Sequence, residues 1–174
     1  MHKEKFKLEN SVGKVLDKTE VFLAAIAGIL IMCSMLTVML EVIVRYIFGT
    51  SFVWVQEYNE YILLYIPFLS GAWLLRNNDH VIVNLIDNIL GKSSSIVLNI
   101  IVAILGILSM IIIVYYSTIV TLDILNRNVT STTVLRTPQV YIYIIIPIGS
   151  FFMLLEFVRQ LIYAIKSRNN SLLE

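Results

Sequence analysis

Long apolar runs separated by short polar stretches dominate the chain. Residues 21–40 form a run of 20 residues without a charged side chain, and residues 96–122 form a run of 27. An α-helix rises about 1.5 Å per residue, so either run is long enough to cross a hydrocarbon core of about 30 Å. The pattern therefore predicts helices that span a membrane.

Four such spans can be placed, at residues 21–48, 51–75, 96–123 and 138–165. The first follows a basic leader but is longer than the apolar core of a signal peptide, so we expect a retained anchor that ends at Gly49. The second begins with polar residues and carries Pro67, which we interpret as a packing kink. In the fourth, Pro138 fits the first turn of a helix, and Glu156 and Arg159 lie three residues apart, where they can pair on one face.

A shorter element with a different pattern follows the second span. Within residues 79–90 the apolar side chains recur at helical spacing: Val81, Ile82, Leu85, Ile86, Ile89 and Leu90. His80 and Asp87 lie on the opposite face. Because this segment is too short to span a bilayer, we predict an amphipathic helix on the membrane surface or packed against the ends of the spans.

Composition agrees with a membrane protein and excludes several classes of function. The chain has 58% hydrophobic and 14% charged residues and a mean hydropathy of +0.84. Cys33 is the only cysteine, which excludes an intramolecular disulfide and a multi-cysteine metal site. Neither His2 nor His80 lies on a predicted span, where a haem would need its ligands. We therefore expect no catalysis, no cofactor, no metal site and no nucleic-acid partner.

The distribution of lysine and arginine predicts the orientation. If both termini are cytoplasmic, ten of the 13 basic residues lie inside, mostly in the leader, residues 1–20, and near the tail, residues 166–174. The remaining three, Arg45, Arg127 and Arg136, lie outside. The positive-inside rule then places both termini in the cytoplasm. The predicted fold is an all-α integral membrane protein, a single membrane domain over the whole chain, with four transmembrane helices and one short amphipathic interfacial helix.

Charged residues gather around the second span. A charge at the centre of a membrane helix costs about 2.5 to 3.5 kcal/mol on insertion scales, so each needs a partner or a place at the interface. The candidate residues for structural or partner contacts are Glu41, Arg45, Trp54, Glu57, Glu60, Arg76, His80 and Asp87. The predicted topology places the first five near the outer surface and the other three near the inner surface.

Three partners are possible for Arg45. It can pair with Glu41, four residues earlier on the same helix, or cross the hairpin to Glu57 or Glu60. We favour a structural clamp over an ion or substrate role for Glu41. Trp54, together with the nearby tyrosines, is typical of the aromatic belt at a membrane interface.

A series of short motifs in this region resembles one transporter family. The motifs are Val44–Phe48, Trp54–Glu57, Phe68–Ala72, Arg76 and His80–Val83. In this order and spacing they resemble the small, four-helix permease subunit of tripartite ATP-independent periplasmic (TRAP) transporters. The resemblance extends over essentially the whole chain, and its specific motifs lie within residues 44–90.

The resemblance implies a transporter subunit and not an enzyme. In that family a soluble periplasmic binding protein captures an organic acid, such as a C4-dicarboxylate or sialic acid, and a large membrane subunit imports it with a sodium or proton gradient. The small subunit braces the large one. The implied partners in the bacterial inner membrane are the large multispanning permease subunit, membrane lipid, and the binding protein at the outer loops 49–56 and 126–137. Arg76 and His80 then anchor the second span to lipid head groups or fix the interfacial helix against the large subunit.

One alternative is a self-sufficient small transporter or channel formed by oligomerisation. Transport sites of secondary transporters are commonly built from internal repeats, discontinuous helices and polar groups at the midplane of the membrane. The sequence shows none of these features, which favours the scaffold subunit.

Overall fold

The computed structural model is all-α. It describes the backbone of residues 11–90 and 92–171, and within them the side chains of residues 13–77 and 96–166. The helices are α1 (Ser11–Phe48), α2 (Val53–Leu90), α3 (Lys92–Arg127), α4 (Gln139–Tyr143) and α5 (Ile145–Ser171). Contacts divide the chain into two compact units, Met1–Trp73 and Leu74–Glu174, where the sequence predicts one domain.

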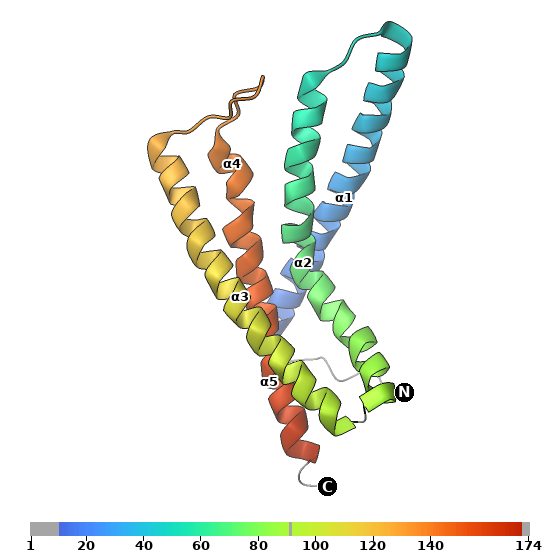
Figure 1. The fold of residues 1–174 in the computed structure, drawn as a ribbon, viewed down its shortest axis with the longest axis vertical. Helices are drawn as coiled ribbons and strands as arrows, with labels where there is room; N and C mark the ends of the chain where they lie inside the picture. The colour runs from blue at the N-terminus through green and yellow to red at the C-terminus, as the bar shows by residue number, and fades with distance from the viewer. Residues whose placement is uncertain (1–10, 91, 172–174) are drawn as a thin grey trace. The chain divides into compact units, whose positions relative to one another are not determined.

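The first unit is a hairpin of α1 and the first part of α2, which run in opposite directions (Figure 1). α1 ends at Phe48, as predicted, because Gly49 adopts a left-handed φ of +67°, and its N–H donates to the carbonyl oxygen of Arg45 at 3.0 Å. The helix begins at Ser11, so the second half of the predicted basic leader continues directly into it.

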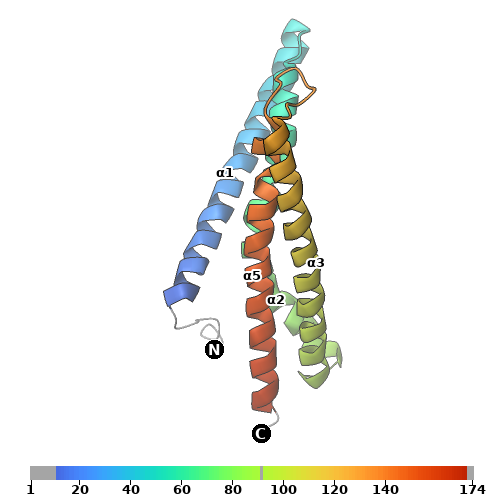
Figure 2. The same ribbon diagram turned by 90° about the vertical axis from the view of Figure 1, so that its left-hand side faces the viewer.

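The second unit contains another antiparallel hairpin, in which α3 lies beside α4 and α5 (Figures 1 and 2). Gly106 of α3 sits against Phe157 of α5, since a Cβ added at Gly106 would lie 2.5 Å from Cε1 of the ring. The missing side chain lets the aromatic ring approach the backbone of α3 closely. Ala103 and Ile145 are buried in the same unit.

The fourth predicted span is divided between two helices. α4 ends at Tyr143 and α5 begins two residues later, while Ile144 keeps helical angles of φ −59° and ψ −26°. Pro147 accounts for the interruption, because it has no N–H to donate to the Tyr143 carbonyl and its ring crowds that group. Pro138 is the N-cap of α4 and not its first-turn residue, so the helix starts one residue later than predicted.

The loop between α3 and α4 is held by its own backbone. The N–H of Ser131 donates to the carbonyl oxygen of Thr137 at 2.9 Å, and the N–H of Gln139 donates to that of Val129 at 3.0 Å. Arg136 has a left-handed φ of 45°, which turns the chain back toward α4. The loop is therefore a folded connection with a defined path.

α2 is one continuous helix where the sequence predicts two elements. The predicted second span, residues 51–75, and the predicted interfacial helix, residues 79–90, are joined without a break through residues 76–78. The predicted boundary was wrong because it followed the change from apolar to polar side chains. A helical backbone is interrupted chiefly by glycine and proline, and neither stands at residues 76–78. Whether residues 79–90 lie at the membrane surface stays a prediction.

Three stretches of the described helices are long and apolar enough to cross a membrane: Gly13–Phe48, Ile96–Arg127 and Gln139–Lys166. They coincide with the first, third and fourth predicted spans, and they confirm the all-α membrane class. α2 is not among them because polar residues flank its uncharged stretch, residues 61–75, on both sides. Its crossing of the membrane stays a prediction.

Most of the apolar surface of these three stretches is exposed. Of the most apolar window of each stretch, only 6% is buried in the first two and 33% in the third. Exposed apolar surface of this extent requires lipid or another protein to cover it. The chain therefore carries little core of its own relative to its apolar content.

Candidate functional site

The end of the first hairpin holds a polar cluster around Glu41. Nε of Arg45 donates to Oε1 of Glu41 at 3.0 Å, and Nη2 of Arg45 contacts the same oxygen. The hydroxyl of Ser51, beyond the turn, donates to this oxygen at 2.9 Å. Glu41 is only 10% exposed at its side chain and Arg45 is 58% exposed. Of the pairings open to Arg45, the structure therefore contains the one with Glu41.

A second polar cluster, two turns away along α1, joins the two helices. The hydroxyl of Ser34 donates to Oδ1 of Asn59 at 2.5 Å, and Nδ2 of Asn59 donates to Oγ1 of Thr37 at 3.3 Å. Nδ2 of Asn59 also donates to the carbonyl oxygen of Val55 at 2.7 Å. The cluster fixes α2 against α1 and satisfies the Asn59 amide within the hairpin.

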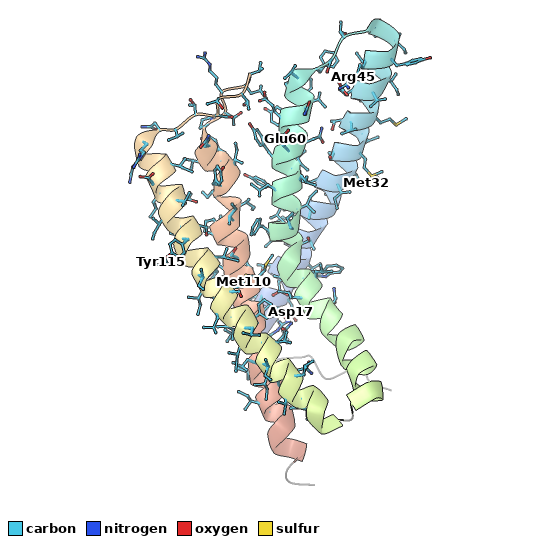
Figure 3. The ribbon with its side chains drawn as sticks, in the orientation of Figure 1. Asp17, Met32, Arg45, Glu60, Met110 and Tyr115 are labelled. Atoms are coloured by element: carbon cyan, nitrogen blue, oxygen red, sulfur yellow. The ribbon has the colours of Figure 1, made fainter. Side chains whose placement is uncertain are left out.

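An open groove of about 420 Å³ runs between the two clusters. Residues of both helices line it: Ser34, Val38, Glu41, Arg45, Val55, Gln56, Asn59, Glu60 and Leu63. Figure 3 labels Arg45 on α1 and Glu60 on α2, and Glu41 of α1 is the third charged side chain in the lining. The groove thus combines hydrogen-bonded polar groups with apolar walls.

Aromatic side chains form a row at the start of α2. The ring centroids of Phe52 and Trp54 are 5.9 Å apart, and those of Trp54 and Tyr58 are 6.3 Å apart in an edge-to-face arrangement. Tyr61 extends the row at 6.3 Å from Tyr58. Trp54 and Tyr58 are about half exposed. Their amphipathic rings suit a membrane interface, and the predicted belt stays a prediction.

Two further ion pairs lie among the described residues of the second unit. Nη2 of Arg159 donates to Oε1 of Glu156 at 2.8 Å, and both side chains are almost fully buried, as the spacing predicts. Nε of Arg127 donates to Oδ1 of Asp123 at 2.8 Å on the exposed surface of α3. Arg127 was predicted only as an outer-loop cation, and its pairing with Asp123 was missed.

The remaining predicted site residues lie at different places along α2. Glu57 is 7% exposed, Glu60 lines the groove, and Arg76 is half-buried farther along α2. His80 and Asp87 lie on the last part of α2, and their side chains fall outside the described residues. Among the described side chains, Glu41, Arg45 and Glu60 line the groove, whereas Trp54, Glu57 and Arg76 are not part of its lining.

Two groups of residues were missed by the sequence reasoning. Ser34, Thr37 and Asn59 form the contact between the helices, and a signal was present, because Ser34 and Thr37 are three residues apart on one helical face of an apolar run. Glu20, placed in the basic leader, is 1% exposed within α1. The sequence did not predict a buried carboxylate at the end of the leader.

Comparison with known families decides the identity. Residues 34–167 match the model of the DctQ component of tripartite ATP-independent periplasmic transporters. The chain belongs to this family. The match begins within α1, extends to the last part of α5 and includes all the predicted site residues, so the DctQ assignment confirms the predicted resemblance. The comparison with curated proteins gives no match.

Membership makes this DctQ component a membrane subunit of a transporter and not an enzyme. Within the described residues, no group of three or more His, Cys, Asp or Glu side chains is placed to hold a metal ion. The Asn59 cluster of the first hairpin joins α2 to α1, and the Glu41 cluster joins α1 to the turn that follows it.

Proposed function

We propose that this DctQ component is the scaffold of its transporter. In this proposal it holds the large permease subunit in the bacterial inner membrane while that subunit imports an organic acid, such as a C4-dicarboxylate or sialic acid. A sodium or proton gradient drives the import, and a periplasmic binding protein delivers the substrate.

The family match carries this proposal, and the arrangement of the charges supports it. Glu41, Glu156 and Asp123 each pair with an arginine on their own helix. Carboxylates held in this way serve the structure of the chain, because binding an ion or a substrate would require breaking the pair. The open apolar surface of α1 and α3 suits a subunit that is covered by lipid and by a larger partner.

The proposal also assigns a side of the membrane to the connecting segment of each hairpin. With both termini in the cytoplasm, the segments 49–56 and 126–137, each a loop with the adjoining helix end, face the periplasm, where the binding protein docks. The second of these loops is held by its own backbone hydrogen bonds. A loop with a defined path loses little conformational entropy on docking.

Co-expression tests the scaffold role. The tagged chain is expected to co-purify with the large permease subunit encoded in the same transporter, and its deletion is expected to abolish binding-protein-dependent uptake of labelled organic acid. Arg45→Ala, which leaves Glu41 without its cation, is expected to reduce both the yield of the complex and the uptake.

Reconstitution separates this proposal from a self-sufficient transporter. If the purified chain alone supports substrate or ion flux in liposomes, the scaffold role is wrong and the oligomeric transporter or channel is correct. If Arg45→Ala leaves assembly and uptake at wild-type levels, the clamp assigned to Glu41 and Arg45 is wrong.

A further inference from the structure

Glu60 stands apart from the other charged residues that line the groove. The Glu41 carboxylate accepts hydrogen bonds from Arg45 and Ser51. The Asn59 side chain is hydrogen-bonded to Ser34, to Thr37 and to the backbone of α2. Among the described residues, neither a hydrogen bond nor an ion pair joins the Glu60 carboxylate. Because Glu41 and Arg45 neutralise each other, the groove carries one uncompensated negative charge.

The length of α2 places this charge close to the hydrocarbon. Its uncharged stretch, residues 61–75, has 15 residues, which rise about 22 Å against a hydrocarbon core of about 30 Å. If α2 crosses the membrane, the core must reach past one or both ends of this stretch, toward Glu60 or toward Arg76. A long arginine side chain can extend to the interface, whereas a glutamate reaches less far.

The walls of the groove include exposed apolar side chains, which favour contact with a helix of another protein over contact with water. Leu63, one turn after Glu60 on α2, is 71% exposed, and Val38 of α1 is 45% exposed. A carboxylate beside exposed apolar side chains favours a partner that covers the apolar surface and supplies one cation at a fixed point. A transmembrane helix with a lysine or arginine on its face meets both requirements.

We propose that Glu60 is the ionic contact at which the large membrane subunit docks on this hairpin. A Lys or Arg side chain from a transmembrane helix of that subunit enters the groove and pairs with the Glu60 carboxylate, while Leu63 and Val38 pack against the same helix. The inference rests on the proposed scaffold function and assigns its contact surface to the groove of α1 and α2.

Charge-removing variants test the contact in the co-expressed complex. Glu60→Gln keeps the shape of the side chain and removes its charge, and we expect association with the large subunit to weaken about tenfold or more, since an unpaired cation is then left in the interface. Glu60→Asp keeps the charge and is expected to retain most of the association. Asp123→Asn is the matched control, because Asp123 is an exposed carboxylate on α3 outside the groove, and we expect it to retain wild-type association.

Chemical cross-linking identifies the occupant directly. Cys33 is the only cysteine, so Cys33→Ala with Gln56→Cys leaves Glu60 in place and carries a single thiol in the groove, and Cys33→Ala with Asp123→Cys carries one outside it. A short thiol-to-amine cross-linker is expected to join the groove thiol to a lysine of the large subunit. If the partner residue is an arginine, a thiol-to-arginylglyoxal linker is expected to give the same product.

The outcomes separate this inference from the scaffold function. If the wild-type chain co-purifies with the large subunit but Glu60→Gln does so equally well, the Glu60 contact is wrong and the scaffold function stands. A cross-link to an aminophospholipid or within the chain itself also overturns the Glu60 contact. If the wild-type chain does not co-purify, both proposals fail. Far-ultraviolet circular dichroism of each variant shows that reduced association does not come from misfolding.

Discussion

At the scale of single residues, three ion pairs of the described helices join side chains three or four positions apart. The pairs are Glu41 with Arg45, Asp123 with Arg127, and Glu156 with Arg159. Such pairs depend only on helical spacing, which is why two of the three could be predicted from the sequence. The contact of Ser34 with Asn59 could not, because the residues are 25 positions apart and meet only through the packing of α1 on α2.

Burial makes the Glu156–Arg159 pair the most consequential of the three. Arg159→Met leaves the Glu156 carboxylate in a site where it is 1% exposed, and we expect a loss of about 3 to 5 kcal/mol in unfolding free energy. Arg127→Met is the control, since that pair is 71% and 53% exposed at its side chains, and we expect a loss of at most about 1 kcal/mol. Unfolding of the purified chain in mixed micelles, followed by circular dichroism, measures both, and equal losses would contradict the role of burial.

At the scale of the elements, the helices could be predicted better than their ends. Gly49 ends α1 where expected, because a left-handed position after an apolar run has a local signature. The interruption before Pro147 was missed, since proline is tolerated within membrane helices and Pro67 does lie within α2 without ending it. The predicted boundary at residues 76–78 was wrong because polarity was taken for a helix end. Patterns of polarity report what surrounds a helix more reliably than where it stops.

The packing of α3 on α5 gives a prediction at this scale. Gly106→Ala places a Cβ within 2.5 Å of the Phe157 ring, and we expect a net loss of about 1 to 3 kcal/mol as the ring shifts. Gly28→Ala is the matched control on α1, where nothing lies within 4 Å of the added Cβ. It should stabilise the helix by about 0.5 to 1 kcal/mol.

The same unfolding assay compares these glycine variants. Adding Phe157→Leu to Gly106→Ala is expected to recover part of the loss, because the smaller side chain vacates the space that the new methyl group needs. If Gly106→Ala and Gly28→Ala have the same effect, the close approach of α3 and α5 is not a determinant of stability.

At the scale of the whole molecule, the outstanding question is whether α2 crosses the membrane. The predicted topology has four spans, and three helical stretches meet the requirement of length and composition. With four crossings the loop at Thr132 and the turn at Thr50 face the same side, and Lys14 and Lys166 face the other. With three crossings Thr132 and Lys166 exchange sides.

Labelling of single cysteines distinguishes the two topologies. In the Cys33→Ala background, Thr50→Cys and Thr132→Cys are expected to react with an impermeant maleimide in intact spheroplasts. Lys14→Cys and Lys166→Cys are expected to react only after lysis, since the positive-inside rule places both termini in the cytoplasm. All four positions are exposed. Labelling of Lys166→Cys but not Thr132→Cys before lysis would show that α2 does not cross.

The pairing of charges within single helices bears on how the chain enters the membrane during synthesis. A carboxylate that meets its arginine within one turn can leave the translocon already neutralised, before any later helix has been made. The first span, with Glu41 and Arg45, and the last, with Glu156 and Arg159, both have this property. The second does not, because its Glu60 has no such neighbour among the described residues. If α2 crosses the membrane and Glu60 pairs with the larger subunit, we expect stable insertion of the second helix to be the step of biogenesis that depends most on that subunit.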